Sequence, residues 1–325
     1  MSEKNLKITG IGSALVDILI HESDDFLVAL GKEKGGMTLV DNKEIQNILS
    51  QSDKKPVVVP GGAACNTIVG VANLGIDAGF IGKRGNDNYG EHFEKTLIQA
   101  CVEPVIQVSD SPTGKVLSVI TPDAQRSMFT FLGASTELAP NSITPEMFKQ
   151  TAITIIEGYL LFNKELIKAC LKAAKAAKSL IALDLASFEI VNASKNILRD
   201  IIKEYVDILI ANEDEAIAYT GSDNELKAIE IMSLNVKYAV LKLGNRGSLI
   251  SFNNKVVKIK PKVGNAPKDT TGAGDLWASG FLFGLANGFS IEKSGQIASA
   301  CGYEVCQVIG AHLHQDAWTR IQQLI

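Results

Sequence analysis

The 325-residue sequence has few cysteines, no long apolar run and no large excess of charge of one sign. Its five cysteines are odd in number and form no C-x-x-C pair, which argues against a disulfide framework or a cysteine-held metal and is typical of reduced thiols in the cytoplasm. No stretch approaches the length of a membrane span, and the first residues lack the apolar core of a signal peptide. A net charge of −4 argues against nucleic acid or an anionic membrane as the main partner. We therefore expect a cytoplasmic protein whose partner is a small molecule.

Two common nucleotide-binding motifs are also missing. Gly10-Ile11-Gly12 begins like a dinucleotide fingerprint, but Leu15 stands where a third glycine is required, so we expect no Rossmann cofactor site. The absence of a Walker A motif argues against a P-loop ATPase. The chain has no internal repeat, low-complexity tract or long linker, and its length alone permits one large domain or two smaller ones.

Near the C-terminal end, a small polar loop leads into an apolar helix. Residues 275–286 are apolar or small at nearly every position, which predicts a helix buried on all sides. The preceding Gly272, Ala273 and Gly274 leave room for an anion to approach the backbone N–H groups at the start of that helix. Asp275 is therefore either a helix-capping acid or a base that takes a proton from an attacking hydroxyl during phosphoryl transfer.

A second glycine-rich junction lies in the first third of the chain. A β-branched run at residues 57–59 leads into Gly61 and Gly62, and then into a helix of small residues. A tight turn before a packed helix explains the glycines but not Asn66. Asp17 lies inside another apolar segment, where it is either solvent-facing on an alternating strand or a group that holds ligand hydroxyls.

Much of the chain alternates strands with helices, which predicts a parallel sheet covered by helices on both faces. Residues 105–132 instead alternate over two or three strands, which predicts a small sheet that projects from the main body. Residues 26–40 lack helical periodicity, so we expect turns and short strands there. The main strands are expected at residues 7–11, 79–82, 153–156, 180–183, 206–210 and 238–243, with a hairpin at 249–259.

Ligands of open parallel sheets bind beyond the carboxyl ends of the strands. The segment from Asn212 to Glu215 follows one such strand and fits two interpretations: a helix N-cap with an acidic first turn, or a site that holds Mg²⁺ through water. Other polar residues that directly follow expected strands are Glu157, Asp184 and Gly244-Asn245.

The run D-T-T-G-A-G-D at residues 269–275, followed by an apolar helix, closely resembles the C-terminal motif of the ribokinase-like (PfkB) carbohydrate kinases. The resemblance extends over nearly the whole chain. It implies a single α/β domain over residues 1–325, built as a three-layer sandwich with a mostly parallel central sheet. It also implies a small β-sheet lid formed roughly by residues 16–42 and 105–134.

The resemblance also implies roles for individual residues. Asp275 matches the catalytic base of the family, and Gly272, Ala273 and Gly274 match its anion hole. The segment K-L-G-N-R-G at 242–247 resembles the T-L-G-x-x-G nucleotide loop, with lysine in place of the usual threonine. Glu215 matches the position that supports Mg²⁺. Substrate-binding positions match Asp17, Gly61, Gly62 and Asn66, and nucleotide-binding positions match Asn212, Lys242, Gly244, Gly247 and Thr270.

Within the family, G-S-A-L-V-D-I-L at residues 12–19 resembles the N-terminal segment of adenosine kinases. Arg126 and Phe131 fall on the expected lid, where a cation and an aromatic ring could meet substrate. The resemblance therefore implies Mg²⁺-dependent phosphoryl transfer from ATP to a primary hydroxyl, with adenosine as the first candidate substrate. A free sugar or sugar acid, such as ribose, fructose or 2-keto-3-deoxygluconate, is the alternative.

A catalytically silent nucleoside or sugar sensor is the candidate from another class, and the intact G-A-G-D run argues against it. Family members differ in whether a monovalent cation such as K⁺ activates them, and they occur as monomers or homodimers.

Overall fold

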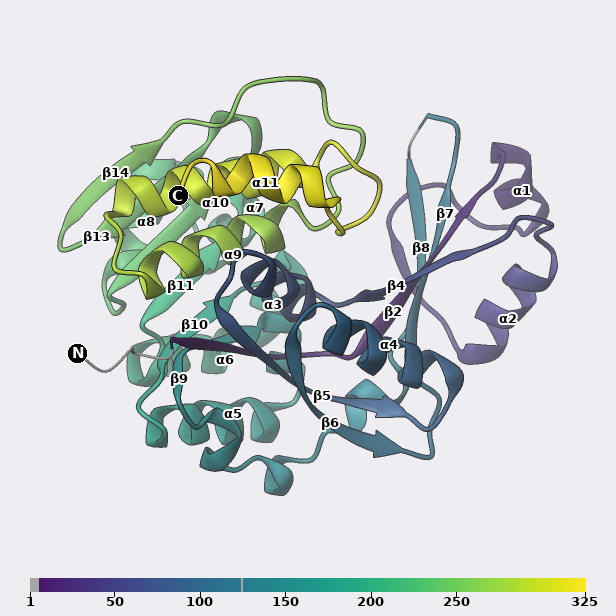
Figure 1. The fold of residues 1–325 in the computed structure, drawn as a ribbon, viewed down its shortest axis with the longest axis horizontal. Coiled ribbons are helices and arrows are strands. Elements are labelled where there is room, and N and C mark those ends of the chain that lie inside the picture. Colours follow the sequence, from purple (N-terminus) through teal and green to yellow (C-terminus); the bar gives the residue numbers. More distant parts are fainter. Residues whose placement is uncertain (1–5, 124) are drawn as a thin grey trace.

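The computed structural model describes residues 6–123 and 125–325. The described strands form two sheets, a large one of nine strands and a small one of five that lies at the right of Figure 1. The large sheet runs in the order β14-β13-β12-β11-β10-β9-β1-β5-β6. Its strands are β1 (Lys7–Ile11), β5 (Asp77–Gly85), β6 (Val102–Ser109), β9 (Thr151–Glu157), β10 (Leu180–Asp184), β11 (Ile208–Ala211), β12 (Tyr238–Lys242), β13 (Ser248–Phe252) and β14 (Lys255–Ile259).

The strands from β12 to β6 are parallel, and β13 and β14 continue the sheet as an antiparallel hairpin. The central strands are apolar almost throughout; all four residues of β11, for example, are buried. This is the composition expected of strands covered on both faces. Because parallel strands all end at the same edge, the sheet brings the residues that follow β9, β10, β11 and β12 to one side of the molecule.

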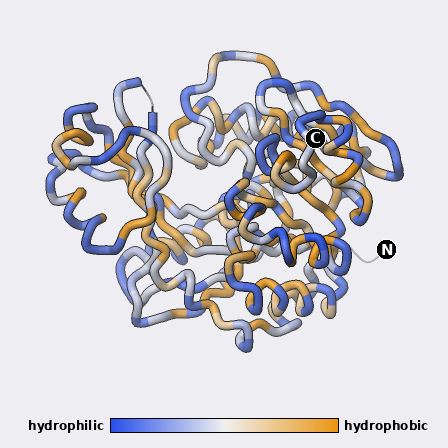
Figure 2. Tube along the Cα trace, turned by 180° about the vertical axis from the view of Figure 1, so that it is seen from behind, coloured by the Kyte–Doolittle hydropathy of each residue, from blue (hydrophilic) through white to orange (hydrophobic). Residues whose placement is uncertain are grey.

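Helices cover both faces of the large sheet and complete a three-layer sandwich. One buried cluster packs the sheet against α3 (Ala63–Asn73), α4 (Asn88–Gln99), α9 (Ala273–Ala286), α10 (Ile291–Val305) and α11 (Gln315–Gln322). A second cluster packs the other face against α5 (Lys164–Ala176), α6 (Phe188–Tyr205), α7 (Glu213–Thr220) and α8 (Glu225–Ser233). Figure 2 shows hydrophobic and hydrophilic segments alternating along the outer helices, as expected for helices with one buried face. The predicted α/β sandwich is confirmed.

The small sheet has the order β3-β8-β7-β2-β4. Two helices, α1 (Asp24–Ala29) and α2 (Asn42–Ser50), cover one of its faces, where Ile18 and Leu117 are buried. The strands are β2 (Leu15–His21), β3 (Met37–Leu39), β4 (Val57–Gly61), β7 (Gly114–Ile120) and β8 (Arg126–Phe131).

The structure corrects the expected extent of the small sheet. Strand β6, which overlaps the start of the range 105–134, pairs with β5 as an edge strand of the large sheet, so only β7 and β8 come from that range. Strand β4, outside both expected ranges, pairs with β2. Alternation along a strand reveals which faces are buried but not which neighbour it pairs with, so the sequence alone could not separate these strands.

The expectation of turns and short strands at residues 26–40 was wrong in part. Helix α1 begins after Ser23, whose side chain accepts a hydrogen bond from Phe26 N, and it buries only Leu27. Because only one of the six residues of α1 is buried, its sequence shows no helical repeat of apolar residues. Helix α2, the next helix, has a clearer pattern in its sequence: Asp41 is its N-cap, and Ile45 and Ile48 are buried three residues apart.

Among residues 6–123 and 125–325, no helix is both long and apolar enough to cross a membrane.

Candidate active site

No side chain in the described part of the structure caps the first turn of helix α9 with a hydrogen bond. Its N-cap residue is Gly272, whose backbone has a φ of +73° and whose added Cβ would lie 2.6 Å from the Cβ of Ala311. Glycine is therefore required here by both conformation and space. The N–H groups of this turn, of which that of Ala273 donates to Thr270 O, and the positive end of the helix dipole make Gly272, Ala273 and Gly274 a candidate site for an anion.

Asp275 lies in this first turn but does not cap it. Its Oδ2 accepts a hydrogen bond from Asn66 Nδ2 at 2.9 Å, and the backbone oxygen of Asp275 accepts one from the Thr67 hydroxyl at 3.2 Å. The pKa of Asp275 is raised to about 7, chiefly by burial; the hydrogen bond from Asn66 and the charge of Lys242 oppose this shift, and the charge of Asp184 adds to it. A carboxyl with a pKa near neutrality beside an anion site is suited to accept a proton from a hydroxyl.

Asn66 follows the Gly61–Gly62 junction and contacts Asp275, which follows the glycines at 272–274. One of its side-chain atoms has no hydrogen-bond partner among the described residues. Its side chain is 6% exposed, and its Oδ1 is buried without a hydrogen-bond partner in the described part of the chain. A buried carbonyl oxygen without a donor is costly, so this atom is best explained as an acceptor for a ligand hydroxyl. In the sequence, a tight turn explained the neighbouring glycines but gave no reason for an asparagine at position 66.

The carboxylate of Asp17 on β2 lies against Gly61, the last residue of β4, where any larger residue would collide with it. A Cβ added to Gly61 would lie 2.5 Å from Asp17 Cγ, and Gly62 has a φ of +99°. Burial raises the pKa of Asp17 to about 7, Arg126 counteracts this, and the charge of Asp275 adds to it. Asp17, Gly61, Gly62 and Asn66 thus come together beside Asp275.

Glu157, at the end of β9, is a site residue that sequence reasoning left unassigned. It is 1% exposed, its Oε1 accepts from Ser13 N at 2.7 Å, and its Oε2 accepts from Ala64 N at 3.2 Å. It therefore caps α3 from another strand and fixes the Gly61–Gly62 junction. Its position directly after a strand was the available clue.

The segment Asn212–Glu215 forms a complete capping box at the start of α7. Asn212 Oδ1 accepts from Glu215 N, and the Glu215 carboxylate accepts from both Asn212 N and Asn212 Nδ2. The structure therefore shows the helix-capping interpretation directly. Burial raises the pKa of Glu215 to about 7, with Lys242 opposing the shift.

Lys242 and the loop after it lie at the same edge. Lys242 ends β12, and its Nζ donates to Asp184 Oδ2 at 2.9 Å. Gly244 and Gly247 both have positive φ, and Leu243 N donates to Gly247 O, so the segment forms a tight loop. Thr270 is exposed beside Gly272 and accepts a backbone hydrogen bond from Ala273.

An ion pair joins the small sheet to the loop that precedes α9. Arg126 of β8 pairs with Asp269, and both side chains are largely buried. The other Asp269 contacts are with Gly310 N at 2.7 Å and with the backbone N–H and the hydroxyl of Thr271. Phe131, by contrast, packs with the buried cluster on the other face of the small sheet, toward Lys115.

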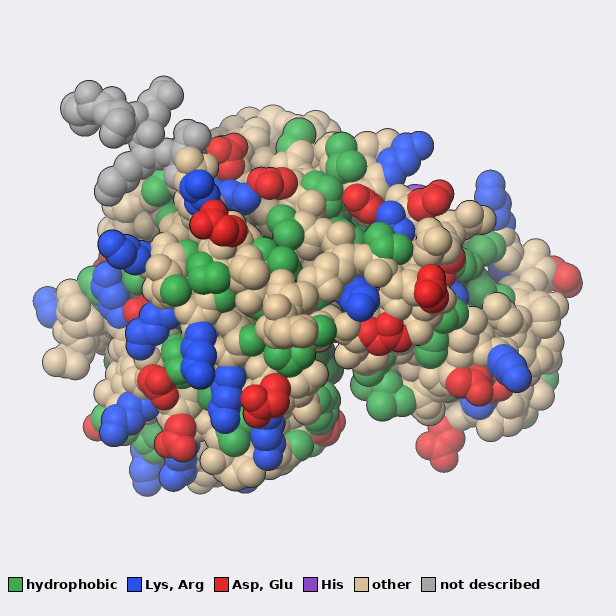
Figure 3. Space-filling model, turned by 90° about the horizontal axis from the view of Figure 1, so that it is seen from below, with side chains coloured by type: hydrophobic (Ala, Val, Ile, Leu, Met, Phe, Trp, Pro, Cys, Tyr) green, Lys and Arg blue, Asp and Glu red, His purple; other side chains and the backbone are tan. Residues whose placement is uncertain are grey.

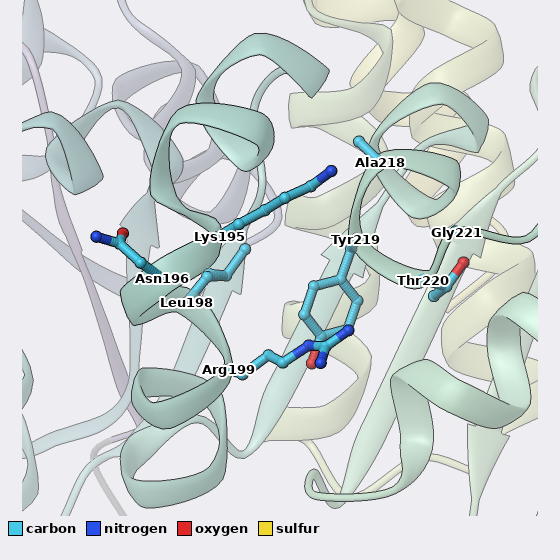
Figure 4. A pocket seen from close by; sticks show the side chains of 8 residues that line it. All are labelled: Lys195, Asn196, Leu198, Arg199, Ala218, Tyr219, Thr220 and Gly221. Atoms are coloured by element: carbon cyan, nitrogen blue, oxygen red, sulfur yellow. The ribbon is translucent and has the colours of Figure 1, made fainter.

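The site is distinct from a cavity of about 500 Å³ on the helical layer, drawn in Figure 4. That cavity lies between α6 and α7, and none of its lining residues belongs to the groups described above. Figure 3 shows that the molecule is hollowed between its larger body and the smaller lobe that holds the small sheet. The site residues from the two sheets meet between these parts.

A family model described as pfkB family carbohydrate kinase matches residues 26–318. The chain belongs to the PfkB family of carbohydrate kinases. It is a kinase of sugars or nucleosides, and the resemblance seen in the D-T-T-G-A-G-D run is confirmed.

The names of individual relatives of this PfkB kinase point to different substrates. The adenosine kinase from Sinorhizobium meliloti has 30% identity and a TM-score of 0.88, with coverage of 99% of this chain and 100% of that one. A probable sugar kinase from Rhizobium etli has 29% identity and a TM-score of 0.89, with 99% of each chain covered. A 5-dehydro-2-deoxygluconokinase of Listeria monocytogenes is 28% identical over 277 residues, which cover 79% of this chain and 82% of the relative.

Proposed function

We propose that this PfkB kinase transfers the γ-phosphoryl group of ATP to a primary hydroxyl of a nucleoside, with adenosine as the first candidate. The observation that supports a nucleoside is an apolar surface on the small sheet beside Asp17. Asp17 pairs with Val116 of β7 and with Val59 of β4, and residues paired in this way present their side chains to the same face.

This face is turned toward the large sheet. Arg126 shares it, because Arg126 pairs with Ile120, which lies four residues beyond Val116 on β7, and Arg126 reaches Asp269. Met128, two residues from Arg126, is on the same face and is half-buried, as are Val59 and Val116. A planar base attached to the sugar would bury these side chains, whereas a free sugar would place hydroxyls against them.

The reaction needs few groups from the protein. The substrate hydroxyl would lie near Asn66 Oδ1 and Asp17, and Asp275 would accept its proton. The hydroxyl oxygen forms a bond to the γ-phosphorus, the bond from that phosphorus to the oxygen shared with the β-phosphate breaks, and ADP leaves with the electron pair. The N–H groups of residues 272–274 would stabilise the charge on the transferred group.

Asn212, Lys242, Gly244, Gly247 and Thr270 are proposed to bind the nucleotide. When bound with ATP, Mg²⁺ neutralises phosphate charge, and it needs only one or two carboxylates besides phosphates and water. The Glu215 carboxylate at the sheet edge fits that requirement by acting through water, since both of its oxygens already accept hydrogen bonds from Asn212. A monovalent cation at Asp269 would have to share that carboxylate with Arg126, and assays in K⁺ and Na⁺ salts test whether it binds.

A sugar-acid substrate is the second candidate, and Arg126 is the observation in its favour. Its guanidinium lies on the substrate face of the small sheet, where it could bind a carboxylate after leaving Asp269. The name of the Listeria relative points the same way. We also propose a cytoplasmic location, consistent with five free cysteines and with ATP as donor.

The test is ADP release with Mg-ATP against adenosine, other nucleosides, ribose, fructose and sugar acids, with Asp275→Asn beside the wild type. Turnover on adenosine that the variant loses supports the proposal. Turnover of a sugar acid alone would support the proposed phosphoryl transfer but contradict the proposed nucleoside substrate. Thermal stabilisation by a ligand without turnover on any substrate would indicate a sensor. Sedimentation of the same samples decides between monomer and homodimer.

A further inference from the structure

Lys242 places an ammonium group against the proposed anion hole. It ends β12 with a side chain that is 14% exposed, and a Cβ added to Gly274 would lie 3.0 Å from its Nζ. The ammonium therefore lies beside the first turn of α9, at Gly274, where the absence of a side chain leaves room for it. In the family motif this position is a threonine, which offers a hydroxyl but no charge.

Acidic groups around Lys242 outnumber what an ion pair requires. Its Nζ donates to Asp184 at 2.9 Å, and the charges of Glu215 and Asp275 also act on it. Burial lowers the pKa of Lys242, but these carboxylates outweigh burial and hold the pKa above its ordinary value, so the group stays charged. One carboxylate, Asp184, contacts the ammonium, and Glu215 and Asp275 act on it through their charge.

The hydrogen bonding of Lys242 is incomplete in the described part of the chain. An ammonium has three donors, and one of them is given to Asp184. A buried charge is stable only when its remaining protons also find acceptors. An anion bound at the N–H groups of residues 272–274 would lie next to Nζ and supply acceptor oxygens.

We propose that Lys242 is a catalytic residue that binds the γ-phosphoryl group during transfer, and that Asp184 is a positioning residue that holds the ammonium between turnovers. This rests on the proposed function. Lys242 keeps its proton and forms no covalent bond; it neutralises charge on the oxygens of the transferred group while Asp275 takes the hydroxyl proton. Such a fixed cation acts where charge is concentrated in the transition state.

The first test compares Lys242→Met, Lys242→Thr and Lys242→Arg by steady-state kinetics with Mg-ATP. We expect Lys242→Met and Lys242→Thr to lower kcat by about 10²–10³-fold with the substrate KM little changed, the range for loss of one transition-state donor. Lys242→Arg should recover part of the loss. Lys237→Met is the matched control: Lys237 is exposed just before the same strand, and its loss should leave kcat unchanged.

The second test does not need turnover. Isothermal titration with the non-hydrolysable ATP analogue AMP-PNP and with ADP asks whether Lys242 contacts the γ-position. Lys242→Met should weaken AMP-PNP binding about tenfold or more and change ADP binding little. If the wild type turned over no substrate, the proposed function would fail, yet this comparison would still test the contact.

Folding is checked separately, because Lys242→Met leaves Asp184 without its partner. The double variant Asp184→Asn with Lys242→Met removes that unpaired acid and should fold as the wild type does while keeping the kinetic defect. The inference is overturned if the double variant retains kcat within threefold of the wild type, or if AMP-PNP and ADP lose affinity equally.

Discussion

The two sides of the site are built differently. On the large-sheet side, Asp275 and the N–H groups of residues 272–274 belong to α9, whose residues 276–284 are all buried and which packs closely on α10. Gly280 lets the two helices meet so closely that an added Cβ would lie 2.7 Å from Ala298 Cα. On the small-sheet side, Leu39 and Met37 of β3 are 63% and 49% exposed.

Under the proposed function, this difference separates chemistry from recognition. The groups proposed to hold the transition state lie on a buried, closely packed helix that cannot shift without disturbing the core. The groups proposed to select the substrate lie on a small sheet with one open face, where side chains can change at little cost to stability. Arg126 and Asp269 connect the two sides.

The strongest test of the chemical side is Asp275→Asn. The amide keeps the size of the side chain but cannot accept the hydroxyl proton, so we expect kcat to fall about 10²–10⁴-fold while KM changes little. Steady-state kinetics measure this, and a thermal melt checks the fold. A loss of less than tenfold would make Asp275 a structural residue and remove the distinction between the two sides.

The glycine of the anion hole provides the next test. Gly272→Ala places a side chain at a φ of +73° and against Ala311, so we expect kcat to fall about 10–100-fold. Gly288→Ala is the matched control: its φ is +72°, but nothing lies within 4 Å of the added Cβ. Both variants should lose about 1 kcal/mol of stability from backbone strain, Gly272→Ala should lose more because of its contact with Ala311, and only Gly272→Ala should lose activity. Equal activities would place the anion elsewhere.

The connection between the sides is tested by Arg126→Ala. The change leaves the largely buried Asp269 without its cation, and we expect kcat/KM to fall about tenfold or more. Lys34→Ala is the control, because Lys34 also pairs with acids on the small-sheet side, Asp24 and Asp123, but in a more exposed setting. If both variants behaved alike, the Arg126–Asp269 pair would have no role in coupling the sheets.

Recognition is tested by Met128→Ser on the open face of the small sheet. Removing apolar surface from the sheet face that also holds Asp17 should raise the KM for a nucleoside by about tenfold and leave kcat nearly unchanged. The same change should leave the KM for a free sugar unaffected if one is turned over. Leu226→Ser, an exposed apolar position on α8, is the control and should change neither constant.

Sequence reasoning found the groups that depend on local chain geometry. The D-T-T-G-A-G-D run and the Gly61–Gly62 junction each combine loop and helix within a few residues, so their residue types reveal the conformation. It did not reveal that Glu157 caps α3, because donor and acceptor are 93 residues apart. For the same reason it could not show that Lys242 faces Gly274 or that β6 belongs to the large sheet.

The smallest expected effect is that of pH, which should change activity and stability in opposite directions. Burial raises the pKa of Asp17 and Asp275 to about 7 from the ordinary value of 3.8 for an aspartate. A base must be deprotonated to act, so kcat/KM should increase as pH rises through about 7, with about a twofold gain from pH 7 to pH 8. In the unfolded chain both carboxyls lose their protons near pH 4.

Between about pH 4 and pH 7 the folded protein therefore binds more protons than the unfolded chain, and its free energy of unfolding should fall as pH rises through this window. Activity profiles and thermal melts on the same samples measure both trends. Glu215, whose pKa burial also raises to about 7, adds to the same trend; Asp275→Asn removes one of these groups, so its stability should depend less steeply on pH, while Lys237→Met should follow the wild type. A wild-type kcat/KM that stays constant from pH 6 to pH 8 would show that Asp275 is already ionised there, and the base would then operate without the shift that burial provides.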